Sequence, residues 1–135
     1  MTEQDIRWRQ RYQQYRKCFA LLDMAIKQPQ LSVIERAGLI QFFEMTFELS
    51  WKLLKDYQEA EGYAIGSPRN AIKQAFQNNL IEDGHMWIKA LEDRNLTTHT
   101  YNEATALAVE EKIRQDYFPL LQQLEQRLAS EAEEK

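Results

Sequence analysis

Residues 37–57 read AGLIQFFEMTFELSWKLLKDY, which is the most apolar stretch of the chain. Its large apolar side chains recur at intervals of three and four residues, which places them on one face of an α-helix. Further apolar residues beside this stripe widen the face. We therefore expect this helix at the centre of a helical bundle, or partly at an interface between subunits. The stripe consists of Ala37, Ile40, Phe43, Phe47, Trp51, Leu54 and Tyr57.

Capping residues set the ends of this helix and of the one before it. Ser32 is a good N-cap for the central helix, and Gly62 is a natural C-terminal stop. An earlier helix is expected from about residue 3 to residue 27, where its apolar side chains again recur at helical spacing. Pro29 ends it, because the residue before a proline avoids the helical conformation.

Three further helices follow from similar signals. Ser67 followed by Pro68 is the expected N-cap and first position of a short helix. Asp83 caps a fourth helix and Asn102 caps the last one. Pro119 lies inside the apolar pattern of the last helix and should kink it.

The predicted fold is all-α, because no stretch shows the alternating pattern of a β-strand. We expect an up-and-down four-helix bundle with one extra short helix and a left-handed twist. A chain of 135 residues suits one domain with a single core. We place that bundle domain in residues 1–130 and expect the charged tail, residues 131–135, to fray.

The composition limits the class of protein. A hydrophobic content of 44% with 28% charged residues fits a soluble globular domain. We expect no signal peptide and no membrane contact, because the first residues are polar and no apolar run is long enough to span a bilayer. The single Cys18 fits a reducing, cytoplasmic location. The net charge of −4 argues against a nonspecific nucleic-acid binder.

One local excess of positive charge lies in the first helix. Five basic residues occur with no acidic residue between Asp5 and Asp23. A solvated helix face is the first interpretation, and a contact surface for RNA or an acidic partner is the second. This basic cluster consists of Arg7, Arg9, Arg11, Arg16 and Lys17.

The segment between the last two helices, residues 94–101, carries side chains suited to chemistry on a phosphodiester. Arg94 is a permanent cation whose planar fork of donors matches phosphate oxygens. His99 can accept or donate a proton near neutral pH. Tyr101 adds a hydroxyl two residues further on.

Spacing constrains how these residues can cooperate. On one unbroken helix, an offset of five residues rotates a side chain by roughly 140°, so Arg94 and His99 would point apart. They converge only if the helix breaks between them or if they meet across a dimer. Arg94 continues the helix face of Trp87 and Leu91, so it should point toward the bundle or an interface. Ordinary capping by an arginine and a histidine remains the alternative interpretation.

Four segments together resemble a known family. Residues 47–57 (FELSWKLLKDY) look like the second-helix signature of the small HEPN proteins called nucleotidyltransferase substrate-binding subunits. Residues 67–72 (SPRNAI) and residues 83–87 (DGHMW) occur in the order expected for that family. Residues 94–101 match its Arg-x4-His-x-Tyr motif in full. The resemblance covers nearly the whole chain.

The resemblance implies a function and partners. Such proteins form homodimers and pair with a separate minimal nucleotidyltransferase. In the toxin–antitoxin version, the HEPN protein is a metal-independent endoribonuclease toxin, and the nucleotidyltransferase is the antitoxin that transfers AMP to the motif tyrosine. Arg94 and His99 would then be catalytic, Tyr101 would be the modified residue, RNA would be the substrate, and no metal or cofactor would be needed.

Two interpretations of function stay open beside a purely structural bundle. In the first, His99 acts as general base or acid while a 2′-hydroxyl attacks the adjacent phosphorus, and Arg94 stabilises the developing charge. In the second, the protein cuts nothing and is a nucleotide- or substrate-binding subunit of a two-component nucleotidyltransferase. The sequence alone does not separate them.

Overall fold

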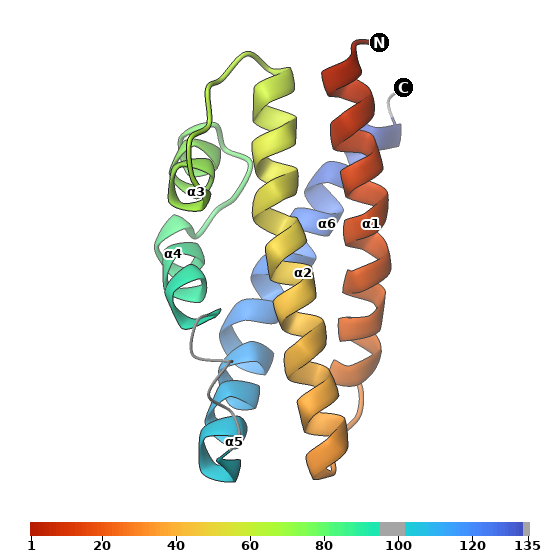
Figure 1. Cartoon of the computed structure of the whole chain (residues 1–135), viewed down its shortest axis with the longest axis vertical. Helices are drawn as coiled ribbons and strands as arrows, with labels where there is room; N and C mark the ends of the chain where they lie inside the picture. The colour runs from red at the N-terminus through yellow and green to blue at the C-terminus, as the bar shows by residue number, and fades with distance from the viewer. Residues whose placement is uncertain (95–101, 134–135) are drawn as a thin grey trace.

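The computed structural model describes residues 1–94 and 102–133, and every element in these ranges is helical (Figure 1). The last three helical elements follow one another without a break and form one long helix, so the described residues form five helices. The predicted all-α fold is confirmed. The elements are α1 (Glu3–Ile26), α2 (Val33–Ala60), α3 (Pro68–Gln77), α4 (Gly84–Asp93), α5 (Glu103–Lys112), the π-helical turn η2 (Ile113–Tyr117) and α6 (Phe118–Glu133).

The predicted caps set the helix ends. The Ser32 side chain accepts a hydrogen bond from the Glu35 backbone N–H, and the Glu35 carboxylate accepts one from the Ser32 N–H. This reciprocal capping box satisfies two N–H groups that a helix start leaves unpaired. Gly62, just past α2, has a φ of 101°, a left-handed conformation that favours glycine.

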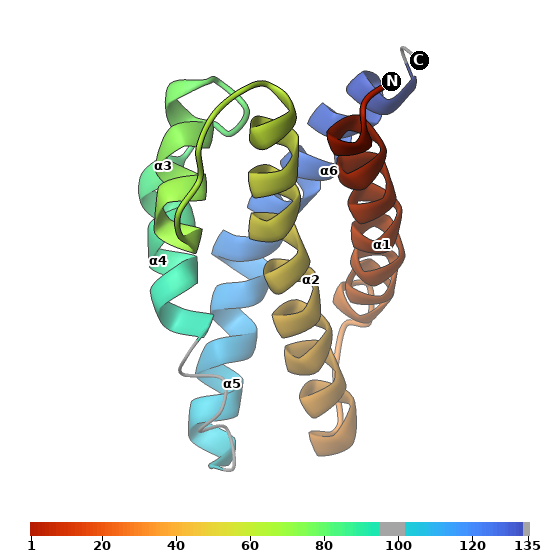
Figure 2. The ribbon, with the colours of Figure 1, turned by 45° about the horizontal axis from the view of Figure 1, so that its top comes forward.

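Helix α2 lies at the centre of the bundle, as the apolar stripe predicted. It packs against α1, α3, α5 and α6. In Figures 1 and 2, α1 runs beside α2 on one side, while α3 and α4 together cover the other side. Helices α3 and α4 have 10 residues each. Together they fill the position of a fourth long helix beside α1, α2 and the continuous α5–η2–α6 helix. The start of α1 and the end of α6 lie at the same end of the bundle (Figure 2).

Aromatic side chains from three helices form the middle of the core. Phe43 and Phe47 of α2 are each 1% exposed, and their rings contact Tyr117 and Trp87, respectively, at centroid distances of 5.7 and 5.8 Å. Truncating one such aromatic to alanine costs about 3–5 kcal/mol. Not all of the predicted stripe is buried, because Ala37 is exposed near the start of α2.

The kink expected at Pro119 takes the form of a widened helical turn. The Phe118 N–H donates to the Ile113 carbonyl, five residues back. Proline has no N–H and its ring collides with the carbonyl four residues earlier in a regular α-helix. A π-turn before Pro119 relieves both problems without ending the helix.

The bundle extends beyond the predicted boundary at residue 130. Helix α6 continues to Glu133, and Nη1 of Arg9 donates to the Ala132 carbonyl at 2.9 Å. Residues 131–133 are therefore helical and attached to α1, which corrects the expectation of a frayed tail there; residues 134 and 135 lie outside the described ranges. Over the described ranges, no helix is both long and apolar enough to cross a bilayer.

Candidate functional site

Of the three predicted motif residues, only Arg94 lies within the described part of the chain. It follows directly after α4, with helical backbone angles. His99 and Tyr101 lie in residues 95–101, outside the described ranges. The structure therefore describes the residues that hold the chain before and after the motif segment, which we call its frame.

Arg94 lies against the central helix. Its Nη1 donates to Oε2 of Glu48 in α2 at 2.9 Å, and its side chain is 27% exposed. Trp87 and Leu91, which share its helix face, are 1% and 8% exposed. The expectation that Arg94 turns toward the bundle is confirmed. The guanidinium therefore keeps part of its surface exposed while a charge-assisted hydrogen bond ties it to α2.

Asp93, the residue before Arg94, contacts the π-helical turn η2. The Tyr117 hydroxyl in η2 donates to the Asp93 carboxylate, and Nζ of Lys112 lies 3.5 Å from Asp93 Oδ2. Burial raises the pKa of Tyr117, and the hydrogen bond to Asp93 raises it further. Tyr117 thus remains a neutral donor under ordinary conditions.

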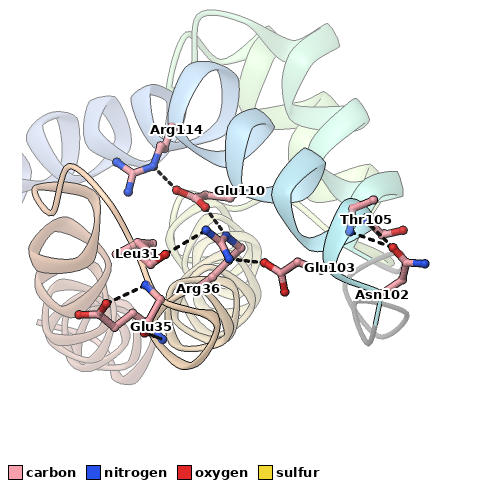
Figure 3. A network of polar contacts seen from close by, with 10 residues as sticks. Leu31, Glu35, Arg36, Asn102, Glu103, Thr105, Glu110 and Arg114 are labelled. Atoms are coloured by element: carbon pink, nitrogen blue, oxygen red, sulfur yellow. Dashed lines mark hydrogen bonds and ion pairs between the residues drawn. The ribbon is translucent and has the colours of Figure 1, made fainter.

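The start of α5, which follows the motif segment in the chain, is anchored to α2 as well. The Asn102 side chain accepts hydrogen bonds from the Ala104 and Thr105 N–H groups, which caps α5 (Figure 3). Glu103, in the first turn of α5, pairs with Arg36. The start of α5 is therefore fixed both by its own cap and by an ion pair to the N-terminal part of α2.

Arg36 lies at the centre of the contacts that hold the start of α5. It also donates to Glu110 through Nε at 2.6 Å and to the Leu31 carbonyl at 3.0 Å (Figure 3). The hydrogen bond to Glu110 is the main cause that raises the pKa of Arg36, opposed by its desolvation. Arg114 donates to the other Glu110 oxygen at 2.7 Å and to the Ile26 carbonyl at 2.7 Å. The network joins α5 and η2 to the connection between α1 and α2.

These contacts tie Arg94 and the start of α5 to the same helix, α2. Arg36 and Glu48 lie about 18 Å apart along α2, at 1.5 Å per residue. The sequence pattern did not predict Arg36, Glu48, Asp93 or Tyr117 as parts of this frame. Their charges and hydroxyl are visible in the sequence, but no spacing rule pairs residues that belong to different helices.

Most of the basic cluster has structural contacts. Nε of Arg11 lies 3.0 Å from Asp56 Oδ2, and Asp56 is 5% exposed. Arg9 stacks on the Trp8 ring besides contacting α6, and Arg16 lies 3.7 Å from Glu125. The cluster is therefore not a uniform solvated face. Arg7 and Lys17 are exposed.

The described residues contain no further arrangement that suggests a catalytic centre. Within residues 1–94 and 102–133, no group of three His, Cys, Asp or Glu side chains is placed to hold a metal ion. A polar recess of about 240 Å³ lies at the C-terminal end of α2. Two of its amides, however, are already used: Asn78 donates to Gln58, and Gln58 donates to the Ala71 carbonyl.

Comparisons with solved structures find the same fold in other proteins. A crystal structure of a protein from Thermus thermophilus matches with a TM-score of 0.77 and 37% identity, covering 84% of this chain and 98% of that one. A Haemophilus influenzae structure, described as showing the fold of a substrate-binding domain of a nucleotidyltransferase, matches with a TM-score of 0.72 and 26% identity over 87% of this chain and 98% of that one.

Two sequence comparisons extend this result. A protein of Haemophilus influenzae named "Probable ribonuclease HepT" is 33% identical over 99 residues, which cover 67% of this chain and 68% of the relative. The family model for nucleotidyltransferase substrate-binding-like proteins matches residues 10–130. That match includes every buried core residue except Trp8, together with the Arg94 anchor and the motif segment. The chain therefore belongs to the nucleotidyltransferase substrate-binding protein-like family.

Proposed function

We propose that the protein is a metal-independent endoribonuclease in which Arg94 and His99 carry the reaction. The observation that supports this most directly is the placement of Arg94. A partly exposed guanidinium is fixed on α2 by Glu48, five residues before the histidine of the motif. A relative that is 33% identical is named a probable ribonuclease. Positioned cations of this kind stabilise the negative charge that develops on a phosphoryl group.

The reaction is an internal transesterification. The 2′-hydroxyl of the RNA attacks the adjacent phosphorus, the new O2′–P bond forms and the P–O5′ bond breaks. One histidine takes the 2′-hydroxyl proton, and a second, protonated histidine gives its proton to the leaving 5′-oxygen, which yields a 2′,3′-cyclic phosphate and a 5′-hydroxyl. Arg94 holds the phosphoryl oxygens. The N-terminus of α5, just beyond the motif, favours a phosphate nearby.

A homodimer suits this chemistry, because two motifs in one cleft supply both the base and the acid. Within this proposal, Arg7 and Lys17 are the members of the basic cluster best placed to contact RNA, since Arg9, Arg11 and Arg16 already have partners in the fold. Sedimentation equilibrium tests the dimer. A species of only 16.1 kDa at micromolar concentration contradicts it.

The direct test is cleavage of a labelled RNA by purified protein, with the matching DNA as control. DNA lacks the 2′-hydroxyl and should stay intact. His99→Ala should abolish cleavage with an unchanged helical circular dichroism spectrum, and Arg94→Ala should reduce kcat by about 10²-fold or more. EDTA should have no effect. Full activity of His99→Ala contradicts the catalytic assignment.

Regulation is proposed to act at Tyr101. A partner nucleotidyltransferase transfers AMP from ATP to its hydroxyl and releases pyrophosphate. The new phosphodiester adds a negative charge and a bulky nucleoside beside Arg94 and His99. The charge competes for Arg94 and the bulk blocks RNA. Intact mass and peptide mapping after co-expression with the partner test this step. Tyr101→Phe should stay toxic to cells and escape neutralisation by the partner; protection of cells from Tyr101→Phe without any AMP adduct points to inhibition by binding alone.

The second candidate is a non-catalytic subunit that binds a nucleotide or substrate for the nucleotidyltransferase. The family description favours it, as does the substrate-binding domain described for the Haemophilus influenzae structure. It predicts saturable binding of ATP or RNA by the pure protein with no cleavage at any concentration. Calorimetry and the cleavage assay, run on the same preparation, separate the two functions.

A further inference from the structure

The end of α4 is tied to two helices through two adjacent residues. Asp93 accepts a hydrogen bond from Tyr117 in η2, while Arg94 donates to Glu48 in α2. Because one peptide bond joins the two residues, an anchor on Asp93 limits where the Arg94 backbone can go. The position of the guanidinium therefore depends on a tyrosine from a different helix.

Helix α4 needs such an anchor. It has only 10 residues, and helices this short are marginal without tertiary contacts. Trp87 and Leu91 bury one face and fix how the helix is rotated. They do not fix its last residue. Of the contacts at Asp93, the Lys112 ammonium is the looser one, at 3.5 Å and 46% exposed, so the hydroxyl of Tyr117 is the main restraint.

Tyr117 is itself held rigidly. It is 2% exposed and stacks on Phe43 of α2. The π-turn lets two consecutive aromatic residues enter the core in different directions: Tyr117 meets α2, and Phe118 stacks on Phe19 of α1 at 5.3 Å. Turns of this kind are rare within α-helices and are frequent at functional sites.

From these contacts we infer that Tyr117, acting through Asp93, is a positioning residue for Arg94. This inference rests on the function proposed above. Tyr117 touches neither substrate nor reacting atoms. Its hydroxyl fixes the end of α4, and the end of α4 sets the place from which Arg94 reaches a phosphate.

A second buried tyrosine supplies a matched control. Tyr15 is 0% exposed, and its hydroxyl donates to the Leu121 carbonyl at 2.6 Å. Tyr15→Phe and Tyr117→Phe each remove one buried hydroxyl donor and leave a phenyl ring of the same shape. Tyr15 joins α1 to α6 and has no part in the Arg94 anchor. A general loss of stability should therefore affect both variants, and a loss of positioning should affect Tyr117→Phe alone.

Steady-state cleavage gives the first readout. Tyr117→Phe should lower kcat by on the order of 10-fold, since a misplacement of about 1 Å can cost ~10²-fold. KM should change less than kcat, because a positioned guanidinium stabilises the charge of the transition state more than the phosphate of bound RNA. Tyr15→Phe should keep the wild-type kcat at a temperature where it is folded. Asp93→Ala should match Tyr117→Phe, whereas Asp93→Asn, which keeps an oxygen acceptor, should restore most of the rate.

A second readout does not depend on activity. The Arg94 Nε–Hε signal in the NMR spectrum of ¹⁵N-arginine-labelled protein is assigned by its loss in Arg94→Lys. It should shift or broaden in Tyr117→Phe and in Asp93→Ala, and stay in place in Tyr15→Phe and Asp93→Asn. An unchanged signal in Tyr117→Phe overturns the inference, as does an equal change in Tyr15→Phe. If the wild type cleaves no RNA, the proposed function fails while this spectrum still decides whether Tyr117 positions Arg94.

Discussion

The contact between Arg11 and Asp56 allows a quantitative prediction about the basic cluster. The pair joins α1 to α2 at 3.0 Å, with side-chain exposures of 29% for Arg11 and 5% for Asp56. Arg11→Ala leaves a buried carboxylate without its partner. Breaking a fully buried pair costs about 3–5 kcal/mol. Since Arg11 is partly exposed, we expect a smaller loss of about 2–3 kcal/mol in the free energy of unfolding.

Thermal and urea unfolding measure this loss. An unfolding entropy of about 2.1 cal/mol/K per residue gives roughly 0.28 kcal/mol/K for a chain of this length, so Tm should fall by about 7–11 °C. The matched control is Arg7→Ala, one helical turn earlier and exposed, which should change stability by less than about 0.5 kcal/mol. Adding Asp56→Asn to Arg11→Ala should recover at least about 1 kcal/mol, because a neutral amide is less costly to bury. Equal Tm values for Arg11→Ala and Arg7→Ala refute the reasoning.

Two pH dependences of stability follow from the pKa shifts of Glu110, Tyr12 and Tyr57. Burial raises the pKa of Glu110, but hydrogen bonds from Arg114 and Arg36 outweigh it and keep the pKa below its ordinary 4.5. The contribution of Glu110 to stability is therefore complete above about pH 4.5 and is lost as the pH falls through the lower, folded pKa; urea unfolding of Glu110→Gln should lack this acid loss. Burial, with Glu125 nearby, raises the pKa of Tyr12 from 10.0 to about 12, and burial, with Glu131 nearby, does the same for Tyr57. Their contribution is complete below pH 10 and is lost between pH 10 and about 12, so Tyr12→Phe should flatten the alkaline limb of a stability–pH profile.

Local signals in the sequence predicted the helices well because capping depends on residues only a few positions apart. Ser32, Ser67, Asp83 and Asn102 each cap the helix that the sequence assigned to them. Local sequence signals did not predict how the helix accommodates Pro119. A proline within a helix can be accommodated by a break, a kink or a π-turn, and the choice depends on the core into which the next aromatic residues pack.

The candidate site was predictable only in part, for the same reason. The side on which Arg94 lies followed from the helix face that it shares with Trp87 and Leu91. Its partner Glu48 is 46 positions away, and its supporting residue Tyr117 lies in a turn whose register depends on Pro119. Ion pairs between helices are set by tertiary packing, which leaves no periodic trace in one sequence.

The pairing of Glu48 with Arg94 predicts that removal of a charged group will strengthen RNA binding, whereas most charge deletions cause a loss. In the proposed reaction, an RNA phosphate must approach a guanidinium whose Nη1 already donates to a carboxylate, 44% exposed, at 2.9 Å. Glu48→Gln keeps an oxygen acceptor for Arg94 and removes the negative charge. Two unit charges about 4 Å apart in water interact by about 1 kcal/mol, so RNA should bind roughly 5-fold more tightly to Glu48→Gln at low salt. Fluorescence anisotropy in the His99→Ala background measures binding without cleavage, and the gain should shrink as added salt screens the charges. Glu44→Gln, one helical turn away on α2, is the control for a general change of charge. Weaker binding by Glu48→Gln, or an equal gain in Glu44→Gln, means that the phosphate does not meet Arg94 at this pair.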